Sequence, residues 1–377
     1  MQGIARGTNA SGMRRYNERL ILSAVRRMNG ASKAELSRIT TLSPQAVVRI
    51  VDELEGDGLL FPAEKRKGGM GQPATIYRIN GERGYTVGVE VGRSGLTLAL
   101  LDFDGTLKAS GRTAVAFPAV DAVVDEIDRF TRDHLSAVNK GGEAFLGVGI
   151  AMPWFLGEWR EETGISDDQA SEWRDPAIEG RLREGISWPV YFENDGNAAA
   201  LAQLLCGAGR DLQNFLCVNL GTFVGGGLVL GGQIVQGRHG NAGALASMPV
   251  CVAGVSDYLI HHASLYNLPS EDGPSRSFWL ERCCEALHFA IVGANSLLDL
   301  EAVVIDGAPP APMLQAIVEN LEDRLRQDVP PDFFMPLVRQ GSLGDTAAAT
   351  GAGLLPLHAS FSPDLAALVK GPAAKQA

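Results

Sequence analysis

SKAELSRITTLSPQAVVRIVDELEGDG, residues 32–58, contains the start signals of two short helices in succession. Ser32 and Glu35 form the Ser-x-x-Glu pattern of a capping box, in which each side chain bonds to the backbone N–H of the other residue. The pattern predicts a helix that starts after Ser32 and turns Leu36 and Ile39 inward. The stretch therefore opens with a short amphipathic helix.

The second helix of this stretch starts at Ser43, a capping serine that is followed by Pro44 at the first helical position. Helical spacing turns one apolar stripe inward and leaves polar side chains on the opposite face. Two short helices joined by a tight turn predict a helix-turn-helix, whose second helix reads base edges in the major groove. The predicted buried stripe is Val47, Ile50, Val51 and Leu54, and the outer face holds Gln45, Val48, Arg49 and Asp52.

The segments on either side predict a winged form of this motif. Upstream, residues 17–28 carry an apolar stripe at helical spacing that ends at Met28. Downstream, residues 59–61 and 75–79 predict the strands of a hairpin whose tip reads KRKGGMG at residues 65–71. A basic, glycine-rich tip is typical of a wing, because Lys and Arg reach phosphates or the minor groove from it. We expect DNA contacts from Ser43, Gln45, Val48, Arg49, Lys65, Arg66 and Lys67.

The charge distribution separates a basic head from an acidic body. Residues 1–80 hold 13 Lys and Arg against 7 Asp and Glu, whereas the other 297 residues hold 20 against 37. The net charge of −11 therefore hides a head of +6. A basic head favours a polyanionic partner, with a merely solvated basic surface as the alternative. Helix spacing, cap chemistry and the basic wing together favour duplex DNA as the partner over a three-helix protein-interaction module.

The bulk properties predict more than one folding unit. A chain of 377 residues is longer than one ordinary core requires, and we expect a winged helix-turn-helix at 1–80 and a second domain at 81–377. The five cysteines form no Cys-x-x-Cys pair and no disulfide framework. No stretch is long enough to span a bilayer, so we expect a cytoplasmic protein without membrane contact.

The second domain alternates strands, glycine turns and helices. Residues 85–107 predict two strands around a turn at Gly92–Gly95, and residues 215–235 repeat this pattern around 221–227. A short strand at 190–193 runs into an Ala-rich helix. Two halves that each open with a β-hairpin indicate an α/β fold of two related lobes. Further strands are predicted at 145–152 and 302–306.

Four segments of this domain, taken together with the head, resemble one protein family. They are the hairpin 88–102, ENDGNAAA at 193–200, the glycine-rich segment 221–243, and LGDTAAATGAGL at 343–354. With them the chain is similar over nearly its whole length to the ROK family (repressors, open reading frames and kinases). The resemblance implies a two-lobed actin/hexokinase-like (ribonuclease H-like) domain that binds a sugar between its lobes. It places lobe one at about 85–195 plus the C-terminal helix and lobe two at about 196–340.

The chain departs from the kinase members of the family at both phosphate loops. In those members the glycine-rich hairpins cradle ATP phosphates through backbone N–H groups. Where they read Asp-x-Gly-Gly-Thr, this chain has Glu90, Gly92, Arg93 and Ser94. Where they read Gly-Thr-Gly-x-Gly, Phe223 replaces the middle glycine and blocks close backbone approach to a phosphate. We therefore expect no catalytic residue and no kinase activity.

The zinc motif of the family, a His followed by three Cys, is missing as well. Ser247 stands where the His belongs, and Cys251 is the one cysteine of residues 244–254. A single thiolate cannot hold a structural zinc, so we expect no metal and no other cofactor. We interpret Cys251 as a buried small apolar residue.

The sugar-binding pair of the family is retained at Asn194 and Asp195. The resemblance implies that the pair holds sugar hydroxyls and that the Asp serves kinase members as general base. From the residues alone, the favoured interpretation of Asp195 is the cap of the following helix. A Glu and a His that the family uses for sugar fall at Ala244 and Ser247. We expect a small sugar-like effector at Asn194, Asp195, His239 and Asn241.

These features favour a ligand-responsive transcriptional regulator, with a repressor of carbohydrate-related genes as the leading hypothesis. We expect a homodimer or a dimer of dimers on a double-stranded operator, because helix-turn-helix proteins usually bind two half-sites related by two-fold symmetry. Two alternatives stay open. Asp195 favours a sugar kinase with a DNA-binding head, whereas Ala244 and Ser247 favour a ligand-independent DNA-binding dimer.

Overall fold

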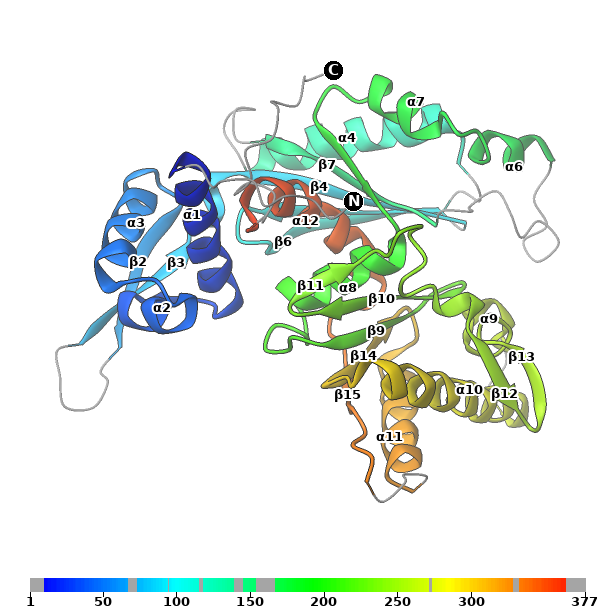
Figure 1. The fold of residues 1–377 in the computed structure, drawn as a ribbon. Coiled ribbons are helices and arrows are strands. Elements are labelled where there is room, and N and C mark those ends of the chain that lie inside the picture. Colours follow the sequence, from blue (N-terminus) through cyan, green and yellow to red (C-terminus); the bar gives the residue numbers. More distant parts are fainter. Residues whose placement is uncertain are drawn as a thin grey trace, which may run out of the picture. The chain divides into compact units, whose positions relative to one another are not determined.

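The computed structural model divides the chain into two compact units, and each is described by itself (Figure 1). One unit, the head, is Met1–Gly84 together with Leu357–Ala377, and the other, the body, is Tyr85–Pro356. The structure describes residues 10–66, 73–93, 95–114, 118–138, 145–153, 167–270, 273–327 and 332–363. No described helix is both long enough and apolar enough to cross a membrane.

The head packs its helices against a small antiparallel sheet. The sheet has the order β1-β3-β2, and a 3-10 helix at Gly81–Arg83 leads out of it. The core takes fully buried side chains from each helix, among them Ile21, Leu36 and Ile50, each contributing roughly 1.5–3 kcal/mol. The elements are α1 (Ala10–Arg27), β1 (Ala31–Ser32), α2 (Lys33–Thr40), α3 (Pro44–Gly56), β2 (Leu60–Arg66) and β3 (Ala74–Ile79).

Both predicted helix starts in the head are confirmed. Ser32 accepts from the backbone N–H of Glu35, and the Glu35 carboxylate accepts from the Ser32 N–H at 2.8 Å, which completes the capping box. Ser43 caps α3 and Pro44 stands in its first turn. The predicted stripe of α3 is buried, with Val47, Ile50 and Val51 at 0% and Leu54 at 3% exposure.

Two apolar residues that were predicted to face inward are exposed. Met28 is 37% exposed because α1 ends at Arg27, and Leu22 takes a core position in that helix instead. Ile39 is 51% exposed, since Thr40 is the buried residue one turn after Leu36 and bonds its hydroxyl to the Leu36 carbonyl. The prediction for Met28 was therefore wrong because the helix ends one residue earlier, and the prediction for Ile39 was wrong because the next residue is the buried one.

The wing differs from its prediction in the length of its first strand. β2 continues through Lys65 and Arg66, which pair with Thr75 and Ala74 of β3, so both basic residues lie on a strand and not at the tip. An irregularity between Pro62 and Glu64 interrupts the register. Lys67 and the rest of the tip lie outside the described residues.

The body contains two sheets with the same strand pattern. The first has the order β6-β5-β4-β7-β8 and the second β11-β10-β9-β14-β15. In each, an antiparallel meander is followed by parallel strands, which confirms two related lobes. The first sheet is β4 (Tyr85–Gly92), β5 (Gly95–Asp102), β6 (Leu107–Thr113), β7 (Phe145–Ala151) and β8 (Val190–Glu193). The second is β9 (Phe215–Leu220), β10 (Val224–Leu230), β11 (Gln233–Val235), β14 (Ala302–Gly307) and β15 (Leu337–Gln340).

Each sheet of the body has its own hydrophobic core. α4 and α7 pack on the first sheet around Leu98 and Ile127, and α10 and α11 pack on the second around Leu287 and Ile305. A hairpin of β12 (Pro249–Val252) and β13 (Val255–Tyr258) lies against α10. The helices are α4 (Val120–Val138), α6 (Asp167–Trp173), α7 (Ile178–Gly185), α8 (Asp195–Leu205), α9 (Ile260–Ala263), α10 (Pro274–Leu298), α11 (Ala311–Gln327) and α12 (Ala347–Phe361), with 3-10 turns at Leu245–Ser247, Leu265–Asn267 and Gly344–Thr346.

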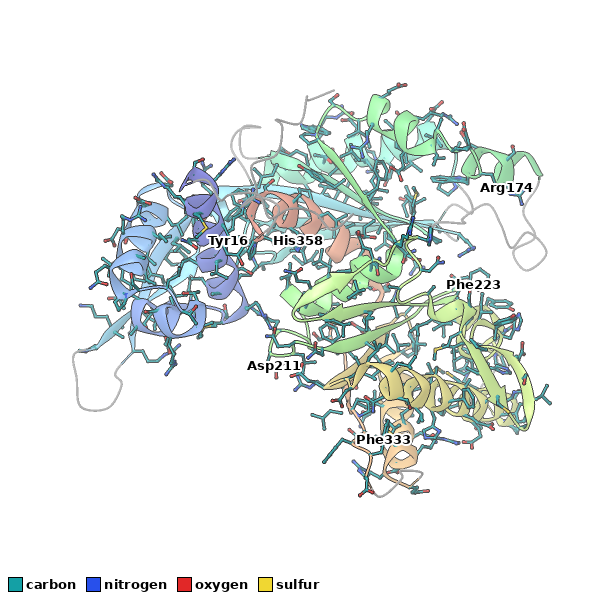
Figure 2. The ribbon with its side chains drawn as sticks, viewed as in Figure 1. Tyr16, Arg174, Asp211, Phe223, Phe333 and His358 are labelled. Atoms are coloured by element: carbon teal, nitrogen blue, oxygen red, sulfur yellow. The ribbon has the colours of Figure 1, made fainter. Side chains whose placement is uncertain are left out.

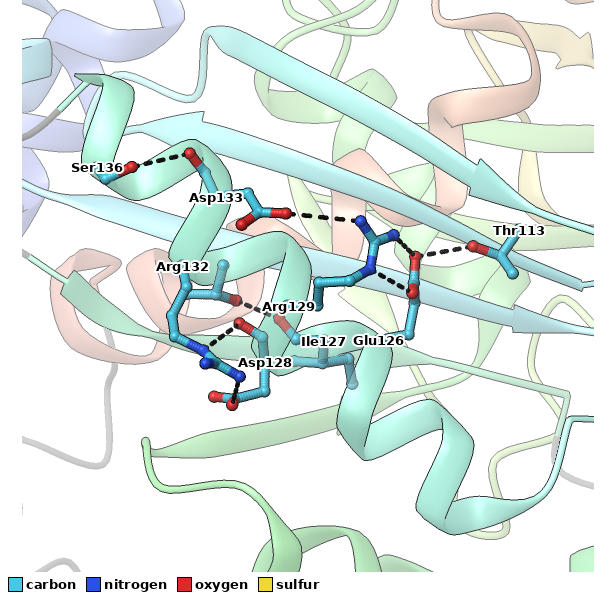
Figure 3. A network of polar contacts seen from close by, with 9 residues as sticks. Thr113, Glu126, Ile127, Asp128, Arg129, Arg132, Asp133 and Ser136 are labelled. Atoms are coloured by element: carbon cyan, nitrogen blue, oxygen red, sulfur yellow. Dashed lines mark hydrogen bonds and ion pairs between the residues drawn. The ribbon is translucent and has the colours of Figure 1, made fainter.

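The outer face of α4 is covered by a network of polar contacts (Figure 3). Arg129 bonds to Glu126 at 2.6 Å and reaches Asp133 at 3.5 Å. Thr113 of β6 donates to the same Glu126 carboxylate at 2.8 Å, which ties the helix to the sheet. Arg129 and Thr113 lower the pKa of Glu126, but the Arg129 side chain is exposed, so solvent screens the pair and it contributes little to stability.

Glycines let α12 approach its neighbours at backbone distance. A Cβ added to Gly351 would lie 1.7 Å from the carbonyl oxygen of Ala198 in α8. A Cβ on Gly88 of β4 would lie 1.9 Å from the carbonyl oxygen of Ala349, and one on Gly149 of β7 would lie 1.8 Å from that of Ala352. Any larger residue at these positions forces the backbones apart.

We predict that Gly351→Ala lowers the melting temperature markedly, because overpacking against fixed backbone costs about 1–3 kcal/mol or more. The matched control is Gly180→Ala on α7, where an added Cβ meets nothing within 4 Å. The control should hold or raise the melting temperature, since Ala favours a helix by up to about 1 kcal/mol. Calorimetry measures both melting temperatures, and equal values for the two variants would contradict the close packing of α12 on α8.

Candidate functional site

The outer face of α3 presents its predicted reading residues to solvent. Gln45 and Arg49 are exposed, Val48 is 43% exposed, and all three line a shallow groove along the helix. Ser43 accepts a hydrogen bond from the Ala46 N–H at 3.3 Å, so its oxygen serves as the cap. The Ser43 hydroxyl keeps its own O–H as a donor.

Acidic side chains next to this face are held by basic ones. Glu53 pairs with Arg49 at 3.3 Å and with Arg14 of α1 at 3.3 Å. Asp52 is bonded to Lys33 of α2. These pairs neutralise the carboxylates that would otherwise repel a phosphate backbone.

The basic residues of the wing strand are placed differently from one another. Lys65 and Arg66 are both exposed on β2. Arg66 lies 3.5 Å from the Glu35 carboxylate of the capping box. Lys65 thus offers its charge to solvent, whereas Arg66 shares its charge with α2.

A second candidate site is a cavity of about 280 Å³ in the body. Residues of both lobes line it, from the β4–β5 and β9–β10 bends, the start of α8 and the segment 240–247. The charged residues among them are Glu90, Arg93, Arg112, Asp195 and Asp345.

Asn194 and Asp195 line this cavity but have different roles. Asn194 is the cap of α8, and its side-chain oxygen accepts from the N–H groups of Gly196 and Asn197. Asp195 is the first residue of the helix, so the cap role weighed for Asp195 belongs to Asn194. Burial raises the pKa of Asp195, while the Gly196 N–H and the Arg93 guanidinium act in the opposite direction.

Glu193 fixes the turn that carries this pair, and the sequence did not single it out. Its buried carboxylate accepts from the Asn194 N–H at 2.8 Å and from the Asn197 amide at 3.1 Å. Gln236, which follows β11 of the other lobe, donates to the second carboxylate oxygen. Glu193 is therefore a positioning residue that joins the two lobes beside the cavity.

Phe223, labelled in Figure 2, sits at the β9–β10 bend and lines the cavity. The Arg93 guanidinium of the other lobe stacks over its ring at 4.2 Å from the centroid. Tyr266 meets the same ring edge-on at 5.0 Å, and its N–H donates to the carbonyl of Thr222 in the bend. Aromatic and guanidinium groups thus occupy the gap between the two glycine bends.

The other predicted ligand residues divide into two groups. Asn241 lines the cavity, together with Ala244 and Ser247, whereas His239 is exposed and is not part of the lining. Asn219 was missed by the sequence analysis; it lines the cavity, and its side-chain oxygen is buried without a hydrogen-bond partner. That oxygen is an acceptor that a hydroxyl group would satisfy.

Cys251 is not the buried residue that the sequence suggested. It lies on β12 and is half-buried, because that hairpin covers α10 with one face and leaves the other open. The five cysteines of the chain all lie in described segments, and none of them forms a disulfide.

With this geometry, comparison with known proteins becomes informative. Residues 86–255, from β4 through the β12–β13 hairpin, match the model of the ROK family. The chain carries a ROK family domain.

The ROK domain has relatives of two kinds. The xylose repressor of Bacillus subtilis (strain 168) is 23% identical over 238 residues, which cover 63% of this chain and 61% of the repressor. The glucokinase of Halalkalibacterium halodurans is 32% identical over 178 residues, covering 45% of this chain and 51% of the enzyme. The chain thus spans about three fifths of the curated xylose repressor's length and half of the glucokinase's.

A solved structure shares the fold over both units. It is described as a ROK family transcriptional regulator and a homologue of the E. coli MLC protein. It is 20% identical, with a TM-score of 0.65, and the match covers 96% of this chain and 100% of that one. At this level of identity the likeness establishes the fold.

Within the ROK domain, Glu90 has a perturbed carboxyl that lines the cavity. Burial, followed by repulsion from Asp195, raises its pKa to about 7, while Arg112 opposes the shift. Asp345 adds to the repulsion, and a hydrogen bond with Thr97 favours the charged form. Near neutral pH, Glu90 is therefore protonated in a large fraction of molecules.

This shift has a defined consequence for stability. A carboxyl whose pKa rises on folding binds more protons in the folded state, so stability falls as pH rises from about 4.5 to about 7. We predict that Glu90→Gln raises the melting temperature by a few degrees near pH 8 and by much less near pH 5. Glu184→Gln, at an exposed site on α7, should change melting equally at both pH values. A pH-independent effect of Glu90→Gln would contradict the assignment.

Proposed function

We propose that this chain is a DNA-binding transcriptional repressor that senses a sugar or sugar derivative in the cavity of its ROK domain. The observation that carries the proposal is the exposed polar face of α3, in a basic head that is joined to a ROK domain. Similarity to a xylose repressor and to a ROK transcriptional regulator supports it.

In the proposed complex, α3 enters the major groove and the wing follows the backbone. Gln45, Val48 and Arg49 read base edges, and the Ser43 hydroxyl and the N-terminus of α3 donate to a phosphate. Lys65, Arg66 and Lys67 contact phosphates without reading sequence. A homodimer, or a dimer of dimers, presents two heads to two half-sites.

The cavity fits a small polyhydroxylated effector by its chemistry. Asp195 and the unpartnered oxygen of Asn219 are acceptors for hydroxyl groups, and Asn241 offers a further amide. The two lobes can close around such a ligand in a two-state change. Glu193 connects the two lobes beside the cavity through its hydrogen bond with Gln236.

A sugar kinase with a DNA-binding head is the second candidate. Asp195 and the similarity to glucokinase favour it, since a buried carboxylate at this position accepts the proton of a sugar hydroxyl. Phosphoryl transfer also needs phosphates held at the glycine bends. The stack of Arg93 on Phe223 at those bends favours the regulator.

We predict that Arg49→Ala changes which DNA sequences the protein prefers, because a side chain in the major groove discriminates bases by about 1–3 kcal/mol. Lys65→Ala should weaken all sequences alike and lower the slope of log Kd against log salt by about one, as expected for a lost phosphate contact. Fluorescence anisotropy with specific and scrambled duplexes measures both the sequence preference and the salt dependence of Kd. Unchanged DNA binding after removal of residues 1–80 would falsify the proposal.

We predict that Asp195→Ala abolishes the response of DNA binding to an effector while ligand-free binding stays near that of the unaltered protein. The effector is sought by thermal shift across sugars, polyols and sugar phosphates, because a true ligand stabilises by mass action. The response should lie in the range of about five- to 150-fold in operator affinity. His239→Ala is the matched control and should keep the response.

The same proteins distinguish the competing functions. ATP-dependent phosphorylation of a sugar that Asp195→Asn abolishes would establish the kinase instead. If no compound shifts melting or DNA binding, the body serves only to dimerise the heads.

A further inference from the structure

Val48 is an apolar side chain on the polar face of α3. The buried stripe of this helix is complete without it, since Val47, Ile50 and Val51 are fully buried. Val48 is 43% exposed between Gln45 and Arg49, and packing within the head does not explain it.

The position of Val48 places it among the reading residues. Residues 45, 48, 49 and 52 follow the spacing i, i+3, i+4 and i+7 of a single helix face. With a rise of about 1.5 Å per residue, Val48 lies about 1.5 Å along the axis from Arg49 and about 4.5 Å from Gln45. Base pairs are about 3.4 Å apart, so Val48 faces the pair read by Arg49 or its neighbour.

The chemistry of valine restricts what it recognises. Val48 has no donor or acceptor, and its β-branch holds its methyl groups in one strongly preferred rotamer on a helix. In the major groove, bases present donors and acceptors except for one apolar group, the 5-methyl of thymine.

The charges around Val48 favour DNA over a protein as its partner. Asp52 is bonded to Lys33, and Glu53 lies between Arg49 and Arg14, so the acidic groups beside Val48 are compensated. The head as a whole carries 13 basic against 7 acidic residues in 1–80. An apolar side chain on a helix face whose acidic groups are paired, in a segment of net positive charge, fits a duplex.

We infer that Val48 reads the 5-methyl group of a thymine within about one base pair of the position that Arg49 contacts. The inference rests on the proposed DNA-binding function and adds the base that this residue selects. The operator therefore contains, in each half-site, a thymine whose methyl group contributes to affinity.

The test removes that methyl group from the DNA. The full-length protein selects duplexes from a randomised pool, and the most enriched duplex is resynthesised with deoxyuridine in place of each thymidine in turn. At one thymine per half-site, the unaltered protein should bind about fourfold more weakly, the value for one buried methyl group. With Val48→Ala the same replacement should change Kd by less than about 1.5-fold.

Two further variants keep the result interpretable. Val255→Ala removes an exposed valine of the body (64% exposed) and should leave the fourfold penalty intact. Val48→Thr keeps the branched shape, and should reduce the penalty to about twofold even if Val48→Ala fails to fold.

The possible results distinguish failure of the thymine contact by Val48 from failure of the proposed DNA-binding function. If the protein enriches and binds a specific duplex but no uridine replacement weakens it, or if the penalty persists in both Val48 variants, the inference is overturned and the repressor proposal stands. If the protein enriches no sequence, both are overturned.

Discussion

Backbone-to-backbone packing of α12 is the constraint on which the body of this molecule depends. The helix meets β4, β7 and α8 at positions where one partner is a glycine, and no side chain fits between them. Ala198 lies one turn after Asn194 and Asp195 in α8, so the contact of Ala198 with Gly351 fixes the helix that carries the polar pair. The start of α8, which contributes Asn194 and Asp195 to the cavity, is therefore held in place by the close packing of this helix on α12.

The same packing brings two buried carboxyl groups of the cavity close together. Glu90 ends up beside Asp195 because β4 and α8 both pack on α12, and neither carboxyl can move away by a backbone shift. Burial raises the pKa of both carboxyl groups, and repulsion from Asp195 raises that of Glu90 further. The arginines Arg93 and Arg112 only partly offset these shifts.

The sequence predicted the parts of the structure that local chemistry determines. The capping box at Ser32 and the cap at Ser43 need only a few neighbouring residues, and both formed as predicted. The repeated hairpins and the turn at Asn194 followed from glycine placement and from the family resemblance. Met28 and Ile39 were misassigned because an apolar residue at a helix end fits either face until the tertiary packing is known.

The candidate cavity was predictable in part, for the same reason. Asn194 and Asp195 were found through a motif, and Asn241 through its closeness in sequence to Ala244 and Ser247. Glu193, Asn219 and the stack of Arg93 on Phe223 depend on contacts that no local pattern encodes. His239 shows the converse: its closeness in sequence to Asn241 suggested a ligand role, yet its side chain is exposed and outside the lining. Two residues that are close in sequence within a loop line the same site only if the loop conformation points both side chains toward it.

The last helix of the chain, α12, is shared between the two units. The chain crosses between its two units at Gly84–Tyr85 and inside α12, after Pro356. Pro356 has no N–H, so the carbonyl of Ala352 loses its helical partner and lies instead against Gly149 of β7. Beyond this point the chain groups with the head, where Arg19 of α1 donates to the carbonyl of Ser362 at 3.4 Å. One helix therefore contributes to both units: α12 packs at backbone distance on β4, β7 and α8 before Pro356, and Ser362, which directly follows the helix, is hydrogen-bonded to α1 within the head.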